Sequence, residues 1–235
     1  MKRILIVAAT YPEIKFLEKT GLKKIEGTSN LFSFINKETG FNVLITGVGM
    51  VATTFHLTQH LSKNNYDLIL NTGIAGTFDK TISLSETVNI VEDCFADLGA
   101  EDDENYLTAF DLGLINENEF PFENGVLKNK TQSNFETINQ LKKVKGITVN
   151  KVHGNEKSVE RFLNDKLQTK NQKPITESME GAAFSYVCMM MNIPHFQIRA
   201  VSNYIEKRNR NAWKIKEALE SLESVLLKLI GEISG

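Results

Sequence analysis

Short, continuous apolar runs recur along the chain, and between them lie segments whose apolar residues return at helical spacing. Continuous runs of this kind are typical of strands that are buried on both faces of a sheet. Because both faces of such a strand must be covered, the pattern also indicates helices on either side of the sheet. The runs predict strands over residues 4–9, 67–70, 86–91, 147–152 and 196–201.

The segments between these runs predict helices over 51–61 and 181–191, the second ended by Asn192-Ile193-Pro194. Other helices are predicted over 131–144, over 156–167 with Val159, Phe162 and Leu163 facing inward, and from near Glu13 onward. A C-terminal helix is predicted from one apolar face formed by Trp213, Ile215, Leu219, Leu222, Leu226, Leu229 and Ile230.

Two further apolar runs, 31–35 and 41–45, predict a β-hairpin whose turn over 36–40 contains Gly40. Residues 93–127 form a long excursion, which predicts a lid, a partner contact or a wall of the active site. Strands that alternate with helices place the chain in the α/β class. Since no repeat or linker interrupts the 235 residues, we expect a single domain over 1–235.

Composition favours a small-molecule partner. The 27 basic and 29 acidic residues leave a net charge of -2, so no overall field attracts nucleic acid or an anionic membrane. The apolar run after Met1-Lys2-Arg3 is too short for a secretion signal, and we expect a cytoplasmic protein. The two cysteines predict no disulfide framework, and Cys188 is expected to act as a small apolar residue. The four histidines show no zinc-ligand spacing, so no metal is expected.

Polar and small residues follow the predicted strands, where reactive groups collect in an α/β sheet. Thr46-Gly47-Val48-Gly49 is a tight turn that lacks the Gly-Lys-Ser/Thr of a phosphate loop and the third glycine of a dinucleotide fingerprint. Glu13 and Glu180 each precede or begin a predicted helix. A carboxylate there is either catalytic or merely favourable beside the helix dipole. Position alone leaves both interpretations open for Glu13, whereas for Glu180 taken alone it favours the helix dipole.

Several blocks occur in a fixed order: Ala8-Ala9 with Glu13 beyond it, then 46–49, then Asn71-Thr72-Gly73-Ile74-Ala75-Gly76, then Ser178-Met179-Glu180-Gly181-Ala182-Ala183, then Arg199-Ala200-Val201-Ser202-Asn203. In this order they resemble the purine nucleoside phosphorylase and uridine phosphorylase superfamily, and they span nearly the whole chain. They are most similar to its nucleosidase branch, which cleaves methylthioadenosine and S-adenosylhomocysteine, and within that branch to the futalosine hydrolases.

This resemblance implies a three-layer nucleoside phosphorylase-like fold, with a central mixed twisted sheet flanked by helices. It implies that Glu180 binds the ribose hydroxyls, that Glu13 deprotonates the attacking water, and that Asn203 meets the base. It also implies a homodimer, a nucleoside and water as substrates, and no cofactor. The other substrate-binding residues that it implies are Val48, Ala75, Gly76, His153, Ser178, Met179, Arg199, Ser202, Arg208 and Arg210.

Two departures from the adenosine-type nucleosidases bear on the substrate. Asn203 stands where those enzymes have an aspartate that protonates adenine, and Ile74 replaces a serine. An amide cannot be a general acid, but it can donate one hydrogen bond and accept another, which suits a 6-oxopurine such as hypoxanthine. Arg208 or Arg210 could then bind the distal carboxylate of futalosine.

The phosphorylases carry arginines at their glycine-rich turns, whereas 46–50 and 71–77 contain none, and this favours hydrolysis. Two alternatives stay open. One is a methylthioadenosine or S-adenosylhomocysteine nucleosidase with altered base contacts. The other is a non-catalytic nucleoside-binding protein of the same fold.

Overall fold

A mixed sheet of ten strands forms the centre of the computed structural model, which describes residues 2–25, 28–103, 105–164 and 176–235. β11 pairs with β5 as well as with β10, so β5, β12, β6, β10 and β11 close on themselves. β9 (Leu127–Lys128) pairs with β6 beside the main path. In spatial order that path runs through β11 (Thr176–Ser178), β10 (Lys142–Thr148), β6 (Thr87–Asp93), β12 (His195–Tyr204), β5 (Leu68–Thr77), β1 (Arg3–Ala8), β4 (Thr39–Ile45), β3 (Leu31–Asn36) and β2 (Lys23–Lys24).

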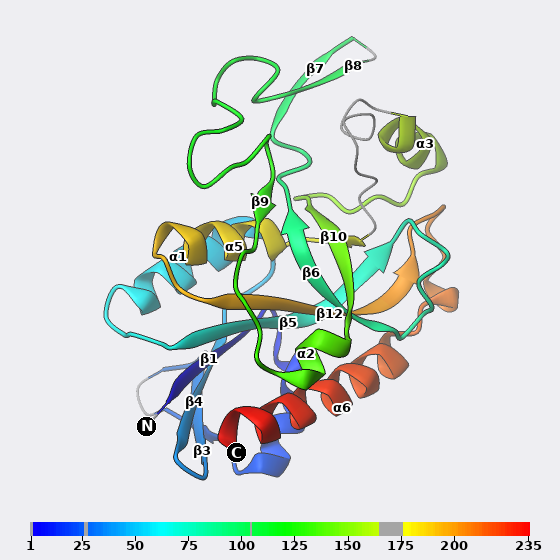
Figure 1. Ribbon diagram of the computed structural model, residues 1–235. Coiled ribbons are helices and arrows are strands. Elements are labelled where there is room, and N and C mark those ends of the chain that lie inside the picture. Colours follow the sequence, from blue (N-terminus) through cyan, green and yellow to red (C-terminus); the bar gives the residue numbers. More distant parts are fainter. Residues whose placement is uncertain (1, 26–27, 104, 165–175) are drawn as a thin grey trace.

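Helices cover both faces of the sheet. α1 (Met50–Leu61) and α5 (Gly181–Met190) lie on one face, and α2 (Glu136–Gln140) and α6 (Ile215–Ser234) on the other (Figure 1). The side chains of β1 alternate between the two layers: Ile4, Ile6 and Ala8 pack with the apolar face of α6, while Leu5 and Val7 pack with α1 and α5. This explains the continuous apolar run of β1, and it confirms the predicted α/β class with a mixed sheet between helices.

The parallel pairing of β4, β1, β5 and β12 brings the ends of these strands to one edge of the sheet. Ala8 is level with Ile45, Val7 with Asn71, and Gly73 with Arg199. Segments that follow β1 and β4 therefore meet residues in the second halves of β5 and β12. This edge carries most of the residues to which the sequence assigned chemistry.

Two strands extend further than predicted. The block 71–76, expected as a polar strand end, lies inside β5, and β12 continues through Ser202 and Asn203 to Tyr204. A register shift between Val201 and Asn203 makes Ser202 a bulge. Each strand supplies the hydrogen-bonding partner that the other needs, so pairing persists where the sequence becomes polar.

The helix predicted over 131–144 and the strand predicted over 147–152 are both misplaced. The only helix there is the short α2, and Val144 belongs to β10, which starts at Lys142 and ends at Thr148. β10 pairs with β6 from Lys142 onward, and its inward residues are buried against that strand. Sheet pairing therefore outweighs the weak helical spacing in this segment.

Other local predictions need correction. The chain at Glu13 forms two 3-10 turns, η1 (Tyr11–Glu13) and η2 (Lys15–Thr20), and not an α-helix. The hairpin turn is tighter than predicted: Lys37 has a positive φ of 53°, and Gly40 already pairs in β4. α3 (Glu156–Asn164) buries Val159 and Phe162 but exposes Leu163, and predicted helical residues 165–167 lie outside the described part. Trp213 precedes α6, and Ile215 is exposed.

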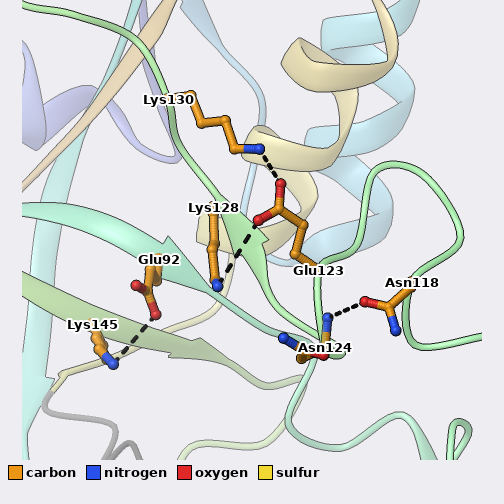
Figure 2. A network of polar contacts seen from close by, with 7 residues as sticks. All are labelled: Glu92, Asn118, Glu123, Asn124, Lys128, Lys130 and Lys145. Atoms are coloured by element: carbon orange, nitrogen blue, oxygen red, sulfur yellow. Dashed lines mark hydrogen bonds and ion pairs between the residues drawn. The ribbon is translucent and has the colours of Figure 1, made fainter.

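The excursion over 93–127 contains a hairpin of β7 (Gly99–Asp102) and β8 (Asn105–Thr108) that projects away from the sheet (Figure 1). Ion pairs lie where the chain returns from this excursion to the strands of the sheet (Figure 2). Glu123 pairs with Lys130 and, at 3.9 Å, with Lys128, and Lys145 of β10 pairs with Glu92 of β6 at 3.3 Å. Among the described helices, none is long and apolar enough to cross a membrane.

Candidate functional site

The predicted site residues fall into two regions along β5 and β12. The first, here called the carboxylate cluster, comprises Glu13, Glu180 and Arg199, and it lies where Arg199 is level with Gly73. The second, the outer pocket, lies further along the same strand pair, where Asn203 is level with Gly76. Three to four strand residues separate the two levels, or roughly 10–13 Å, which is the length of a nucleoside.

Glu13 is held by the turn in which it lies. Its Oε2 accepts hydrogen bonds from the backbone N–H of Thr10 at 2.8 Å and from the hydroxyl of Thr10 at 3.1 Å, so this oxygen caps η1. Its Oε1 points to β5, where the N–H of Ile74 donates to it at 3.3 Å. Capping therefore uses one carboxylate oxygen and leaves Oε1, facing the cluster, as the one that can hold a water.

Burial raises the pKa of the Glu13 carboxyl above its ordinary value, and the negative charge of Glu180 adds to the rise. The hydrogen bonds from Thr10 and the positive charge of Arg199 act in the opposite direction. A carboxylate with a raised pKa is a stronger base than an exposed one, which suits a group that takes a proton from water.

Glu180 occupies the N-cap position of α5 but does not cap that helix with its side chain. Its Oε1 instead accepts a hydrogen bond from the N–H of Gly49, the N-cap residue of α1, at 2.9 Å. The carboxylate thus lies near the positive ends of two helices, where a negative charge is favourable. The helix-dipole interpretation explains why the charge is tolerated, and it does not exclude a substrate role.

Arg199 is one of the largest fully buried side chains. Its Nη2 donates to the side-chain oxygen of Asn71, and its Nη1 donates to the carbonyl of Ile198 at 3.3 Å. Burial lowers the pKa of the guanidinium, while attraction to Glu180, Glu13 and Asp93 opposes the shift. An arginine stays protonated in proteins, so a fixed positive charge lies among these carboxylates.

The absence of a side chain at Gly73 is what allows the cluster to form. A Cβ at this position would lie 2.5 Å from Oε1 of Glu13 and 3.4 Å from Nη1 of Arg199. The first distance is far inside van der Waals contact. Gly73 therefore lets the base candidate and the guanidinium approach β5 together.

A second buried carboxyl supports the start of α5. Asp93 accepts hydrogen bonds from the hydroxyl of Thr148 at 2.9 Å and from the side-chain amide of Gln197 at 3.1 Å. Thr148 in turn accepts the N–H of Ala182, in the first turn of α5, at 2.7 Å. Burial raises the pKa of Asp93 to about 6, against the hydrogen bonds that it accepts. This network fixes the helix start that carries Glu180.

The outer pocket is open to solvent. Its empty space is about 400 Å³, a volume that includes solvent at its mouth. The residues that line it do not include Glu13, Glu180 or Arg199, so the carboxylate cluster is not part of this pocket. Its walls are Leu84, His153, Asn203, Tyr204, Glu206, Arg208, Asn209, Ala212 and Trp213.

Asn203 is half-buried at the inner side of this pocket. Its Oδ1 accepts from the hydroxyl of Ser202 at 2.8 Å, and its Nδ2 donates to the carbonyl of Tyr204 at 3.2 Å. The Ser202 hydroxyl also lies 3.3 Å from the carbonyl of Ala75. A Cβ on Gly76 would come within 3.1 Å of Nδ2, so the predicted residues Ala75, Gly76 and Ser202 fix the position of the amide.

His153 contacts a residue that the sequence analysis passed over. Both oxygens of Glu177 are engaged by it: Oε1 accepts the backbone N–H of His153 at 3.0 Å, and Oε2 contacts the ring Nδ1. Glu177 is buried, and only 17% of the His153 side chain is exposed. The rings of Phe78 and Phe162 pack against the imidazole. Residues 176–178 are all polar, so nothing in their sequence indicates that they form a buried strand.

The two arginines near the pocket are not equivalent. The Arg208 guanidinium lies 4.9 Å from the centre of the Trp213 ring and lines the pocket, and its backbone N–H donates to the carbonyl of Gly154 at 2.9 Å. Arg210 lies 5.9 Å from the same ring but is not among the lining residues. Trp213, predicted to lie on the C-terminal helix, instead lines the pocket, and the guanidinium groups of both arginines lie over its ring.

The remaining predicted residues lie around Glu180. Val48 is exposed between Gly47 and Gly49, both of which have positive φ. Ser178 is buried, and its hydroxyl accepts the N–H of Gly181 at 3.2 Å. Met179 is partly buried beside Glu180. The structure therefore brings the predicted residues to one edge of the sheet, while Asn71, Asp93 and Glu177, which hold several of them, were missed.

Known proteins similar to this chain are named as futalosine hydrolases or as nucleosidases. A futalosine hydrolase of Thermus thermophilus is 30% identical over 202 residues, which cover 85% of each chain. A 5'-methylthioadenosine/S-adenosylhomocysteine nucleosidase of Haemophilus ducreyi is 25% identical over 242 residues, covering 99% of this chain and 95% of the relative. Both kinds of enzyme thus occur among the relatives.

Solved structures agree on the fold. The futalosine hydrolase of Helicobacter pylori superposes with a TM-score of 0.76 at 16% identity, covering 98% of each chain. A 5'-methylthioadenosine/S-adenosylhomocysteine nucleosidase from Neisseria meningitidis superposes with a TM-score of 0.77 at 15% identity, covering 99% of this chain and 100% of that one. The sequence signature of the Phosphorylase superfamily matches residues 3–231, which confirms the resemblance found in the sequence: this chain belongs to the Phosphorylase superfamily.

Proposed function

We propose that this protein hydrolyses the N-glycosidic bond of futalosine, releasing hypoxanthine and dehypoxanthine futalosine in the futalosine route to menaquinone. One observation carries the proposal: two carboxylates and a buried guanidinium meet at the strand edge that also presents Asn203. The nucleosidase names of the relatives support an enzyme of this kind.

Cleavage of the bond develops positive charge on the ribose and negative charge on the departing purine. Glu180 would bind the ribose hydroxyls and stabilise the oxocarbenium-like transition state. Glu13 would hold a water at Oε1 and accept its proton, and the raised pKa of this carboxyl matches that role. Arg199 would keep both carboxylates in place by its fixed charge.

The surroundings of the cluster favour water over phosphate as the nucleophile. The N–H of Gly49 at the glycine-rich turn is engaged with Glu180, so this amide is not available to an anion. Neither 46–50 nor 71–77 contains an arginine. Glu13, facing the same space, would repel a bound phosphate.

Base and distal groups would be read at the outer pocket. The Asn203 amide can donate to the carbonyl oxygen of hypoxanthine and accept from its ring N–H. Arg208 lines the pocket, and we assign the distal carboxylate of futalosine to it in preference to Arg210.

A methylthioadenosine or S-adenosylhomocysteine nucleosidase is the second candidate, because relatives of that name match up to 99% of the chain. Its adenine would present an amino group, a donor, where hypoxanthine presents an acceptor. The two substrates therefore make opposite demands on Asn203.

A purine-release assay across futalosine, aminodeoxyfutalosine, methylthioadenosine and inosine, with and without phosphate, tests the proposal. We expect hypoxanthine from futalosine, and a free sugar product at the same rate in phosphate-free buffer. A 1-phosphate product would contradict hydrolysis, and preference for methylthioadenosine would favour the second candidate. Binding without turnover of any nucleoside would indicate a non-catalytic protein.

The proposal includes a homodimer. α1 exposes 82% of Val51 and 58% of Phe55, next to the exposed Val48, and this apolar surface lies beside the turn that contacts Glu180. Light scattering at micromolar concentration should give twice the mass of 26.4 kDa. A monomer that becomes a dimer only at much higher concentration would contradict this part of the proposal.

A further inference from the structure

We propose that His153, oriented by Glu177, is the proton donor to the departing purine, a catalytic role that rests on the proposed nucleosidase function. The need for such a group follows from Asn203. An amide can form hydrogen bonds to the base but cannot release a proton to it. A purine that leaves as an anion is a poor leaving group, so a separate acid in the same pocket would account for the missing aspartate.

The sheet places Glu177, Gly76 and Asn203 in one row. Glu177 is level with Gly76 in the β11–β5 pair, and Gly76 is level with Asn203 in the β5–β12 pair. Residues that are level in neighbouring strands present their side chains on the same face. Glu177 and Asn203 therefore share a face across two strand spacings, about 10 Å. Gly76 adds no side chain between them, and the side chains of Ile205 and Asn203 pack over it.

Glu177 is paired with His153. Glu177 exposes only 3% of its side chain, and a carboxylate buried to this extent is costly without a polar partner. His153 is that partner through both its backbone N–H and Nδ1. Because Nδ1 is occupied, Nε2 is the nitrogen that can meet a ligand in the outer pocket, which His153 and Asn203 both line.

The surroundings of the ring favour a fixed orientation. Phe162 and Phe78 have ring centres 4.9 Å and 5.8 Å from that of His153, and they restrict its rotation. A carboxylate, an oriented imidazole and a site for a reacting atom form the arrangement that general acid catalysis uses. Glu177 is the positioning residue in this pair, because it would act through His153.

In the proposed step the C1′–N9 bond breaks and its electron pair stays on the purine, while the N–H bond at Nε2 of His153 breaks and its proton passes to a purine ring nitrogen. Water forms the new C1′–O bond and gives a proton to Glu13. Glu13 then releases its proton to solvent and His153 takes one up, so both residues return to their starting state and the net reaction consumes one nucleoside and one water.

Two substrates with different leaving groups test this role. A purine nucleoside needs protonation of its base, whereas 4-nitrophenyl β-D-ribofuranoside releases a stable nitrophenolate without it. We expect His153→Gln to lower kcat for the purine nucleoside about a hundredfold and to change nitrophenolate release by less than about threefold. Glu177→Gln should show the same selectivity with a smaller loss. His56→Gln, the same substitution on α1, is the control and should leave both rates unchanged.

Equal losses on both substrates would overturn the proposal, because a merely structural role does not distinguish leaving groups. A raised KM with unchanged kcat would also overturn it and leave His153 as a binding residue. Failure of the wild type to release nitrophenolate, while it still releases purine, counts against it as well. If His153→Gln does not fold, the comparison with Glu177→Gln decides in the same way. If the wild type releases no purine from any nucleoside, the proposed function itself fails.

Discussion

The carboxylate cluster and the outer pocket lie on the same pair of strands but are built differently. The cluster joins residues from distant parts of the sequence, Glu13, Glu180 and Arg199, and its hydrogen bonds come largely from backbone groups. Most of the outer pocket comes from one stretch, 203–213, with Leu84 and His153 added; its charged side chains are exposed and its aromatic side chains are partly buried. The difference indicates that the carboxylate cluster would bind the ribose and the attacking water, while the outer pocket would bind the base and select the substrate.

The strongest test of the cluster is loss of a carboxylate. Glu13→Gln and Glu180→Gln should each lower turnover at least about a hundredfold, the scale expected when an acid-base or preorganised electrostatic group is removed. Both proteins should stay folded, which circular dichroism and thermal melts can check. Glu217→Gln, at the exposed start of α6, is the matched control. If either folded variant kept near-normal turnover, the carboxylate that it lacks would have only a structural role.

A smaller change should disturb the cluster without removing any charge. Gly73→Ala places a methyl group 2.5 Å from Oε1 of Glu13, so the carboxylate must shift. Since small misplacements of catalytic groups are costly, we expect a loss of roughly tenfold to a hundredfold in kcat. Gly231→Ala in α6, where a Cβ meets nothing within 4 Å, should leave activity unchanged and stabilise the fold by about 0.5–1 kcal/mol. Full activity of Gly73→Ala would show that Oε1 needs no fixed position.

Replacing Asn203 in the outer pocket should change selectivity more than rate. Asn203→Asp should shift the ratio of kcat/KM for futalosine over aminodeoxyfutalosine toward adenine by roughly tenfold to a hundredfold, which corresponds to one mispaired buried polar group of about 1–3 kcal/mol. These nucleosides differ only in the base, so distal contacts cancel in the ratio. An unchanged ratio, or a wild type that prefers adenine, would mean that Asn203 does not read the base.

Asp93 supports the start of α5 beneath the carboxylate cluster. Of the variants discussed, its replacement should have the smallest effect on turnover, and its main effect should be on the free energy of unfolding. Burial raises the pKa of Asp93 from 3.8 to about 6, so the folded state retains a proton that the unfolded state has already lost. Stability from this group is complete below pH 4 and is lost as pH rises toward 6, by as much as about 3 kcal/mol. Denaturant unfolding of the wild type and Asp93→Asn at pH 4 and pH 7 measures the difference. The variant should gain relative to the wild type at pH 7, and a constant difference would contradict the raised pKa.

How far the sequence predicts the site depends on how local each contact is. The strand ends and the order of the blocks indicated the edge at which Glu13, Glu180 and Asn203 lie. They could not indicate that Oε2 of Glu13 caps its own turn while Oε1 faces Gly73, because these contacts depend on strand register. Glu177 gave no signal, because its partner His153 lies 24 residues away along the chain.

The sequence by itself determined the α/β class and the superfamily, because continuous apolar strands and ordered small-residue blocks are local patterns. Only the tertiary structure decided that β5 and β12 continue through their polar ends, that Val144 belongs to a strand, and that Trp213 lines a pocket. In each case a hydrogen-bonding or packing partner from elsewhere in the chain outweighed the local preference. Such partners become adjacent only when the sheet has formed, so the sequence pattern near each residue does not contain them.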